Sequence, residues 1–378
     1  MTRLLLAGAG HAHALVLLDW AQAPLPGVEL VVVSPQALVP YSGMVPGWLA
    51  GAYRFDQIVI DFPALCRAAG ARWVEGEIHT LDAAQRRLRL GSGEELGYDL
   101  LSLNVGSTLT PPDGGETPVL AMRPLSQLHA AYDTLLARWV DDASDRPFTV
   151  TAVGGGAAGF ESLLAVQARL RALRPQRAVH GTLVTRGSTL LPGLSGAARR
   201  AALQALHGSG ATLQLGTAWS ETIARRSDLV LWATGAEAHA WQRDPARCAG
   251  LAVSDNGFIR VDAQLRSVSH PQVFAAGDCA AWATPLPKAG VYAVRMGPVL
   301  AHNLRAALGQ GAPRLYRPQT RYLVLLATAD AAAIASRGPF GARGRWAWRW
   351  KDHIDRRFVS RFAVADGVDR ANCAAGSA

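Results

Sequence analysis

The sequence has few cysteines and no long apolar run. Only four of its 378 residues are cysteine (Cys66, Cys248, Cys279 and Cys373), with no CxxC motif and no metal-ligand spacing. This scarcity argues against a disulfide framework, a zinc site and a CxxC redox centre, so we predict no metal and favour a reducing cytoplasm. No stretch of about 18 uninterrupted apolar residues occurs, which argues against a membrane-spanning helix.

Acidic residues are also in short supply. The chain has 38 Lys and Arg against 29 Asp and Glu, a formal net charge of +9. This excess indicates an acidic partner, which could be nucleic acid, anionic lipid or phosphorylated cofactors. Nucleic acid is the least favoured of these, because no RNA- or DNA-binding motif is present. The length indicates two or three domains, and 49% hydrophobic residues are enough for large cores.

Apolar runs alternate with helical patterns along the chain, which predicts an α/β fold with parallel sheets. Two units repeat this pattern. The first opens with "LLLAGAGHAHA" and closes with "YDLLSLNVGS" (98–107), and the second runs from "FTVTAVGGGAAGFE" (148–161) to "DLVLWATGAE" (228–237). Two similar units predict two bound nucleotides. The Pro- and Gly-rich stretch 108–118 between them indicates a crossing between domains.

The first of these stretches, Leu4–Leu18, has two interpretations. A positive charge, an apolar run and small residues resemble a secretory signal. Gly8-Ala9-Gly10 directly after a strand-like run is instead the opening of a dinucleotide-binding βαβ unit. The order of the other motifs favours the second interpretation. We therefore expect this segment to be retained as the first strand and helix of a cofactor domain.

The second unit carries the more regular phosphate-binding turn. Gly154, Gly156 and Gly159 have GxGxxG spacing directly after an apolar strand-like run. The three glycines allow a tight turn, a close approach of the backbone to pyrophosphate, and close packing of helix on strand. The following helix start presents free N–H groups and a positive dipole to the phosphates.

The first turn departs from this pattern. Gly8 and Gly10 fit, but His13 stands at the third glycine position, where an imidazole should loosen the packing unless it turns aside. His11 and His13 diverge on a helix, so a packing or solvent-facing role is favoured over catalysis or metal binding. His11 is still a candidate cofactor contact because it directly follows Gly10.

The strand ends also depart from the usual dinucleotide fold, in which an acidic residue binds ribose hydroxyls. Here the second strand of the first unit ends in Ser34-Pro35, so a hydroxyl or backbone group must replace the acid. The corresponding strand of the second unit ends in Thr185-Arg186. Arg186 could bind the 2′-phosphate of NADPH or be an ordinary surface charge, so NADH and NADPH both remain open.

Three further stretches complete a resemblance that covers nearly the whole chain: "LVPYSGMVPGWLAG" (38–51), "VFAAGDCA" (273–280) and "PKAGVYAVRMGPVLAHNLRAAL" (287–308). With the glycine turns, they make the chain similar to FAD/NAD(P) flavoproteins with two dinucleotide-binding domains. Type II NADH dehydrogenases and sulfide:quinone oxidoreductases are examples. The flavoprotein domain fused to selenophosphate synthetase resembles the chain most, and "WRWKDHIDRRF" continues that subfamily's tail.

The resemblance implies two Rossmann-like domains. An FAD domain (1–116 and 251–312) is interrupted by an NAD(P) domain (117–250), and a C-terminal element (313–378) follows. It also implies that Asp278 hydrogen-bonds the ribityl chain of non-covalently bound FAD. The candidate cofactor-binding residues are Gly8, Gly10, His11, Ser34, Pro35, Gly106, Gly154, Gly156, Gly159, Arg186, Gly235, Gly277, Asp278 and Ala289.

Three residues are candidates for catalysis. Lys288, at the start of the helix near Ala289, is a cation near the flavin carbonyl or a solvated lysine. Glu161 lines the nicotinamide approach to the flavin or, as a first-turn carboxylate, complements the helix dipole. Tyr41, in the loop beside the flavin, stacks, gates or simply packs.

The resemblance implies an FAD-dependent oxidoreductase that passes electrons from NADH or NADPH to a quinone or a similar small-molecule acceptor. Alternatives are a flavoenzyme of sulfur or selenium metabolism and a non-catalytic flavin-binding redox module. Sulfide chemistry by the known route is disfavoured, because Cys66 and Cys248 lie outside the matching motifs. The sequence leaves the oligomeric state open.

An amphipathic helix is predicted over 343–362. Its apolar stripe is Trp346, Trp350, Ile354, Phe358 and Phe362, with arginines around it. Such a helix can lie in the headgroups of an anionic bilayer. It can equally dock on the FAD domain with its aromatic side chains buried. A cytoplasmic protein is expected, and the first alternative would attach it to the inner face of the cell membrane.

Overall fold

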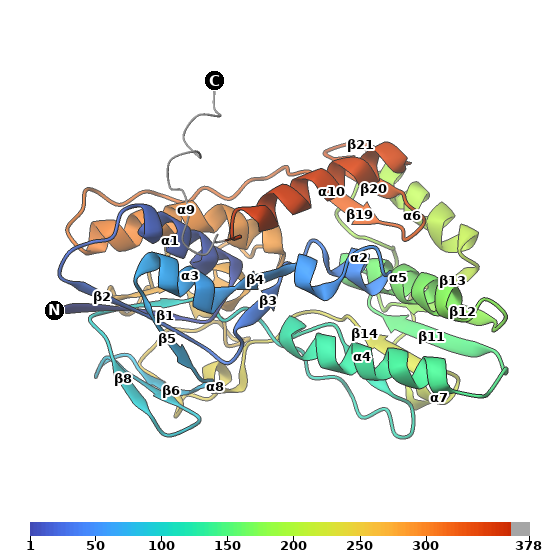
Figure 1. Cartoon of the computed structure of the whole chain (residues 1–378), viewed down its shortest axis with the longest axis horizontal. Helices are drawn as coiled ribbons and strands as arrows, with labels where there is room; N and C mark the ends of the chain where they lie inside the picture. Colours follow the sequence, from blue (N-terminus) through green and yellow to red (C-terminus); the bar gives the residue numbers. More distant parts are fainter. Residues whose placement is uncertain (364–378) are drawn as a thin grey trace.

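The computed structural model describes residues 1–363 and has two α/β halves side by side, with a helix lying across both (Figure 1). The first half contains a five-stranded parallel sheet of order β17-β9-β1-β2-β5. Its strands are β1 (Thr2–Ala7), β2 (Val28–Ser34), β5 (Arg72–Glu75), β9 (Leu100–Leu103) and β17 (Val273–Ala275). Because β17 comes from late in the chain, two separate stretches build this half.

The second half contains its own five-stranded parallel sheet, of order β10-β14-β11-β12-β13. Its strands are β10 (Val119–Ala121), β11 (Phe148–Val153), β12 (Val179–Val184), β13 (Ala211–Gln214) and β14 (Leu229–Trp232). The predicted α/β fold with two parallel sheets is confirmed. The predicted closing strands lie as expected, since β9 pairs with β1 and β14 pairs with β11.

The first sheet is buried on both faces, which explains its nearly continuous apolar strands. Leu4 and Leu6 pack with the helices on one face, whereas Leu5 and Ala7 pack on the other. The helices are α1 (His11–Gln22), α3 (Phe62–Ala69) and α9 (Gly290–Ala307). The other face is covered by a smaller sheet of β6 (Ile78–Asp82), β7 (Arg87–Leu90), β8 (Glu95–Gly97) and β15 (Cys248–Ala249).

Short elements complete the first half. They are β3 (Leu38–Pro40), α2 (Val45–Leu49), η1 (Phe55–Gln57), β4 (Val59–Asp61), α8 (Ala240–Arg243), β16 (Ile259–Arg260), η2 (Gly277–Cys279) and β18 (Ala280–Ala281). The first two crossings between the halves meet in an antiparallel bridge between Thr108 and Glu237. Cys248 already pairs with β6, so the chain re-enters the first half before residue 250.

The second half has helices α4 (Leu125–Asp141), α5 (Ala157–Leu173), α6 (Gly196–Gly208) and α7 (Glu221–Arg225). Its core also takes in Met44, Val45 and Trp48 from the first half's chain. Thus α2, in the loop predicted to run beside the flavin, packs on α5. This contact helps to hold the two halves together around the space between them.

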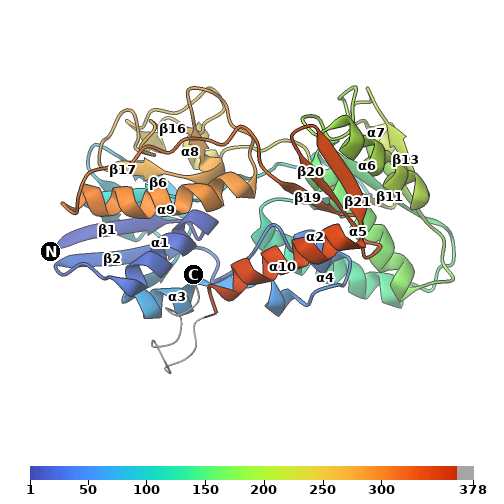
Figure 2. The same ribbon diagram turned by 90° about the horizontal axis from the view of Figure 1, so that it is seen from above.

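The last described part is an antiparallel sheet of β19 (Val324–Ala327), β20 (Ala333–Arg337) and β21 (Phe340–Gly344), followed by α10 (Arg345–Ser360). From above, α10 runs from the second half toward α1 and α3 of the first (Figure 2). The C-terminal residues 364–378 of the expected C-terminal element, with Cys373, lie outside the described residues. Among residues 1–363, no helix is long and apolar enough to cross a membrane.

The helix predicted over 343–362 is present, but its apolar stripe is divided. Trp346, Trp350 and Ile354 are 52%, 44% and 38% exposed, whereas Phe358 and Phe362 are buried. The inward face of the helix carries Ala347, Lys351, Asp355 and Phe358. The stripe is therefore neither wholly exposed, as a membrane-bound helix would have it, nor wholly buried against the protein. The ion pair of Lys351 and Asp355 occupies part of the face that packs on the protein.

Candidate cofactor and electron-transfer site

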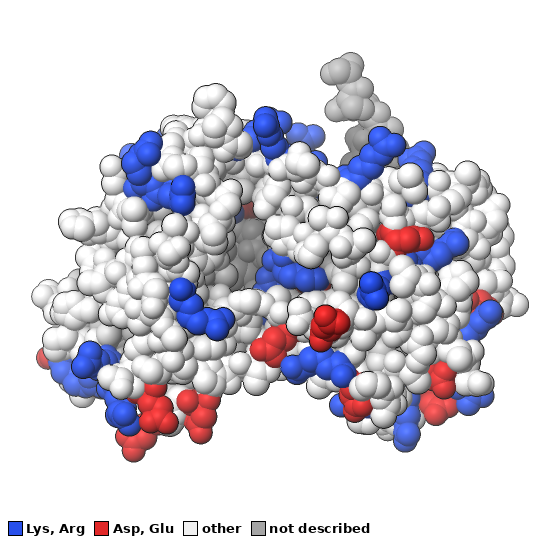
Figure 3. Space-filling model, turned by 180° about the vertical axis from the view of Figure 1, so that it is seen from behind, with Lys and Arg blue, Asp and Glu red and all other residues white. Residues whose placement is uncertain are grey.

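A cavity of about 800 Å³ lies between the two halves and reaches both glycine turns. Its wall includes Gly10, His11 and Asp278 from the first half and Gly156 and Glu161 from the second. Figure 3 shows the hollow from behind, with basic side chains beside it. The turns follow the carboxyl ends of parallel strands, where doubly wound folds bind nucleotides.

The first turn is tight because two glycines contact Asn104. Gly8 has φ +97°, and a Cβ there would lie 2.6 Å from the backbone oxygen of Asn104. A Cβ on Gly10 would lie 2.1 Å from Asn104 Oδ1. Any side chain at either position would displace Asn104.

Asn104 connects the turn, the helix start and a strand from late in the chain. Its Oδ1 accepts hydrogen bonds from the backbone N–H of Ala12 (3.0 Å) and of His13 (3.3 Å). Its Nδ2 donates to the backbone oxygen of Ala276 (2.6 Å). Asn104 was not among the residues predicted from the sequence, although a polar side chain directly after the buried strand "LLSL" was a usable signal.

His13 is a packing residue that fills the third glycine position without loosening it. Its ring is fully buried, with Nδ1 2.6 Å from the oxygen of Gly8 and Nε2 2.8 Å from Ser102 Oγ. Burial lowers the pKa of His13 to about 4, so the ring is neutral. The imidazole therefore joins the turn to β9, which excludes the solvent-facing alternative.

His11 lies on the cavity wall, and its unpaired ring nitrogen indicates whether the site fits a cofactor. Its Nε2 is buried and has no hydrogen-bond partner within the described part of the chain. Burial lowers the pKa of His11 to about 4. A neutral ring nitrogen without a partner beside the first glycine turn fits a bound dinucleotide that supplies the missing hydrogen bond.

In the second turn, each glycine has a different environment. Gly154 has φ +130°, and a Cβ there would lie 2.4 Å from the oxygen of Ala233. A Cβ on Gly159 would lie 2.0 Å from the oxygen of Gly154, so this glycine allows close packing of α5. Around Gly156 there is open space, as expected if its backbone faces a pyrophosphate. Three distinct environments fit the GxGxxG roles.

Polar groups other than the usual acid surround the end of β2. Ser34 and Pro35 line the cavity, as predicted. Glu77, which the sequence analysis missed, lines it too, and it follows β5, the strand next to β2. An acidic residue is therefore present at this end, but from the neighbouring strand. Arg186 follows β12, is exposed and does not line the cavity.

Of the other predicted glycines, Gly106 and Gly235 line the cavity with φ of +72° and +52°. Gly277 also has a positive φ but is buried against Asn104, and it does not line the cavity. It thus supports the first turn from behind.

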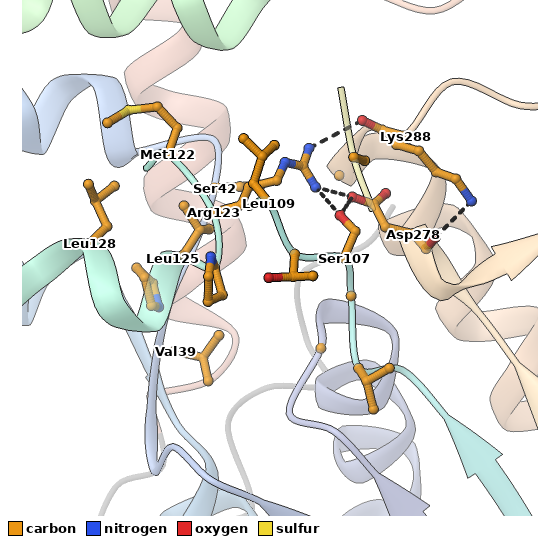
Figure 4. A pocket seen from close by; sticks show the side chains of 18 of the residues that line it. Val39, Ser42, Ser107, Leu109, Met122, Arg123, Leu125, Leu128, Asp278 and Lys288 are labelled. Carbon is orange, nitrogen blue, oxygen red and sulfur yellow. Dashed lines mark hydrogen bonds and ion pairs between the residues drawn. The ribbon is translucent and has the colours of Figure 1, made fainter. Parts of the chain in front are cut away.

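Asp278 forms an ion pair that sequence reasoning missed. Arg123, which follows β10 in the second half, donates from Nη1 to Asp278 and to Ser107 Oγ (Figure 4). Ser107 in turn donates to Asp278 (3.2 Å). Asp278 lines the cavity as predicted, and its carboxylate also ties the two halves together.

The ammonium group of Lys288 is not a free cation that faces the cavity. Nζ donates to the backbone oxygens of Asp278 and Ala280, each at 2.7 Å, and lies 3.7 Å from the ring centre of Phe258. Burial lowers the pKa of Lys288. The geometry thus favours a fastening role over the expected contact with a flavin carbonyl. Ala289 caps α9 and lines the cavity, as predicted.

Glu161 lies on the cavity wall in the second turn of α5, which begins at Ala157, so its expected role as a first-turn carboxylate is wrong. Its Oε1 accepts a hydrogen bond from the backbone N–H of Ala327 (2.7 Å). Burial raises the pKa of Glu161 to about 7, although Lys351 and the Ala327 bond oppose the shift. The carboxyl group can therefore hold or release a proton near neutral pH.

Tyr41 does not line the cavity but packs behind it. Its ring lies 4.5 Å from the ring of Phe358 and 5.4 Å from that of His11. Burial and the neighbouring Asp355 raise the pKa of Tyr41. Of its three proposed roles, the geometry supports packing.

The helix α10 carries a buried ion pair. Lys351 Nζ donates to Asp355 (2.7 Å) and to the backbone oxygen of Gly43 (2.5 Å). Both side chains are about nine-tenths buried or more. Through Gly43, α10 is fastened to the loop between β3 and α2.

The described cysteines are unsuited to thiol chemistry. Cys66, Cys248 and Cys279 are buried and unpaired. Burial raises the pKa of Cys279 and of Cys248 to about 11, and that of Cys66 to about 12. Thiolates are the reactive form, so none of the three is poised as a nucleophile. Within residues 1–363, no group of His, Cys, Asp and Glu could hold a metal ion.

Two Rossmann-like halves with facing glycine turns and a shared cavity define a flavoprotein that binds two dinucleotides. The chain belongs to the pyridine nucleotide-disulphide oxidoreductase family, whose model matches residues 2–303. As a member of this family, the chain uses FAD and NADH or NADPH as cofactors. A comparison with curated proteins found no match.

Solved structures with this fold include sulfide:quinone oxidoreductase from Aquifex aeolicus (TM-score 0.76, 14% identity, 96% of this chain and 91% of that one covered). NDH2 from Plasmodium falciparum in complex with NADH is also similar (0.73, 12% identity, 95% and 98%). A third is NADH:rubredoxin oxidoreductase from Clostridium acetobutylicum (0.67, 17% identity, 90% and 82%). At such low identity, these similarities show the fold alone.

Proposed function

We propose that the chain is an enzyme that passes electrons from NADH or NADPH through FAD to a quinone. The observation that carries this proposal is the single cavity lined by both glycine turns. The name of one structural neighbour, sulfide:quinone oxidoreductase, supports a quinone as the acceptor, and that of another, NDH2 in complex with NADH, supports NADH as a donor.

Residues of the first half would hold FAD. Gly10, His11, Ser34 and Asp278 line the cavity. In this proposal the first three bind the phosphates and ribose of FAD, and Asp278 binds its ribityl chain. Bound FAD accepts a hydride from a nicotinamide and passes the electrons on. The free N–H groups at the start of α9 would stabilise negative charge near the cavity wall.

Glu161 is the group that we assign to proton handling. Reduction of a quinone to a quinol needs two electrons and two protons, while NAD(P)H supplies one hydride, so one further proton must come from water. Glu161 is half-buried on the cavity wall, and desolvation there raises its pKa to about 7. It can hold that proton inside the cavity and be reprotonated at neutral pH.

The outer face of α10 supports access to a quinone dissolved in a bilayer. Trp346 and Trp350 stack with ring centres 6.3 Å apart, and both are exposed. Aromatic side chains beside arginines favour the headgroup region of an anionic membrane. We therefore propose peripheral attachment through this face. Replacing both tryptophans by serine tests it better than truncating α10, whose inner face is buried.

An anaerobic titration tests the proposed function. NADH or NADPH should bleach the flavin absorbance of the purified protein, and a soluble quinone should restore it over many turnovers. Bound FAD that neither donor reduces would instead favour a redox module. Reoxidation of the reduced flavin by an oxidised electron-carrier protein such as rubredoxin, but not by any quinone, would reject the quinone as the acceptor.

A further inference from the structure

A second hollow, of about 450 Å³, lies on the outer surface where α1, α9 and the end of α10 meet. Figure 1 shows the C-terminal end of α10 reaching this layer of helices. Apolar side chains and arginines together line the hollow: Leu15, Val294 and Val299, and Arg295, Arg317 and Arg361. The hollow is separate from the cofactor cavity, with which it shares no lining residue.

The charge around this hollow is unbalanced. Within residues 1–363, no Asp or Glu pairs with Arg295, Arg317 or Arg361, and none lines the hollow. The stretch 289–329 contains five arginines and no acidic residue. In Figure 3, the upper edge shows Lys and Arg without Asp or Glu, whereas side chains of both charges lie along the lower edge. Like charges around one opening repel one another, so a bound anion would stabilise them.

Donors at the hollow suit a phosphate group. Guanidinium groups bind phosphate oxygens with two parallel hydrogen bonds. Gln319, which also lines the hollow, has a buried Nε2 without a partner within the described residues. The apolar floor formed by Leu15 and its neighbours would not be needed by a small soluble anion, but it suits the glycerol and first acyl carbons of a lipid.

Arg361, which lines the hollow, lies on the same side of α10 as the exposed Trp350. Arg361 keeps helical dihedrals (φ −62°, ψ −24°). It follows Ile354 by seven residues and Trp350 by eleven, which are close to two and three whole turns at about 3.6 residues per turn. Its side chain therefore leaves the helix on the face that carries Trp350 and Ile354.

We propose that this hollow binds the phosphate of an acidic phospholipid, with the three arginines on the phosphate and the apolar floor against the lipid backbone. The proposal rests on the membrane attachment proposed above and names the lipid that it recognises. A soluble phosphate ester would use the same arginines, but it would not depend on the neighbouring tryptophans.

The test compares two triple variants with the same change of charge. One is Arg295→Gln/Arg317→Gln/Arg361→Gln. The control is Arg67→Gln/Arg89→Gln/Arg226→Gln, at exposed arginines that make no side-chain hydrogen bond or ion pair in the described structure. Binding of full-length holoprotein to phosphatidylcholine vesicles, with and without phosphatidylglycerol, is measured at low salt. Reduction of flavin by NAD(P)H is measured in parallel.

We expect the first variant to bind phosphatidylglycerol vesicles roughly 100-fold more weakly, at about fivefold for each arginine near the surface. The control should lose less than about tenfold, and both should keep flavin reduction. Equal losses in the two variants would overturn the lipid site while leaving membrane attachment standing. Wild-type protein that ignores these vesicles would overturn both, without affecting the NAD(P)H reaction. If inorganic phosphate or glycerol 3-phosphate at micromolar concentration displaces the protein from the vesicles, the hollow binds a soluble ligand instead.

Discussion

The two glycine turns have the same strand–turn–helix form, but they are held differently. The first is braced from outside, since Asn104 bonds the start of α1 and His13 joins the turn to β9. The second depends on its own glycines, and Gly156 faces open space. Bracing fixes the first turn before any ligand arrives, which suits a resident cofactor. The open second turn suits a dinucleotide that binds and leaves.

Gly10→Val should have the largest effect. Its first side-chain carbon would lie 2.1 Å from Asn104 Oδ1, so the brace and the turn cannot both keep their positions. We expect loss of FAD and a strongly lowered melting temperature, measured by flavin absorbance and thermal unfolding. Gly97→Val, at a position with nothing within 4 Å, is the matched control. Normal FAD content in Gly10→Val would show that this turn does not hold the flavin.

Gly156→Val should separate the two turns. The added side chain meets no protein atom within 4 Å at its Cβ, so the fold and FAD should be kept. It would occupy the space of the pyrophosphate, and losing charge-assisted hydrogen bonds at roughly 1.5–3 kcal/mol each should slow flavin reduction by at least about 100-fold. Gly208→Val in α6 serves as control. If NAD(P)H reduces the Gly156 variant normally, the second turn is not the donor site.

Asn104→Ala tests the brace itself. It leaves two buried N–H groups and one carbonyl without their partner, each costing roughly 1–3 kcal/mol, although these costs are not additive. We expect a loss of about 3 kcal/mol in the free energy of unfolding and weaker FAD retention, measured by urea unfolding. Thr185→Ala, beside Gly155 in the second turn, should change stability far less. Equal losses in the two variants would contradict the comparison.

Glu161, in the helix that follows the second turn, should make the stability of the protein depend on pH. Its pKa is raised to about 7 in the folded protein, so folding favours the protonated form and stability falls as pH rises through 7. Between pH 6 and pH 8 we expect wild type to lose about 1 kcal/mol more than Glu161→Gln. The two should be compared by urea unfolding at each pH. If the free energy of unfolding changes equally with pH in the two proteins, the carboxyl group of Glu161 does not titrate in this range.

Arg186→Gln should have the smallest effect. An exposed arginine at the end of β12 would contact a 2′-phosphate only when NADPH is bound. We expect the KM for NADPH to rise up to about tenfold, with the KM for NADH unchanged. Equal changes for both donors, or none, would make Arg186 an ordinary surface charge. The two turns would then still differ in how they are held, but the second unit would not distinguish NADPH from NADH through Arg186.

Local patterns made the two units predictable. Apolar runs such as "LLLA" and "FTVTAV" indicate strands buried on both faces, and glycine spacing marks the turn that follows each. The structure confirms both sheets and the predicted closing strands β9 and β14. These features depend on neighbours in the sequence, which is why they could be predicted from it.

What joins the units could not be predicted in this way. Arg123 meets Asp278 across 155 positions, and Asn104 meets Ala276 across 172. Such contacts depend on which strand ends lie side by side. The same holds for Lys288, whose ammonium is satisfied by two backbone oxygens rather than left free.

The sequence by itself determined the fold class, the family and the order of the two nucleotide-binding units, because a strand, a glycine turn and a helix are each specified by adjacent residues. Only the tertiary structure decided which side chains brace the first turn and which face of α10 is buried. The periodicity of α10 marks an apolar stripe, but its packing selects the face with Lys351 and Asp355, since these two charges satisfy each other and Gly43 inside the protein. Three of the five stripe residues, Trp346, Trp350 and Ile354, are therefore left exposed to solvent.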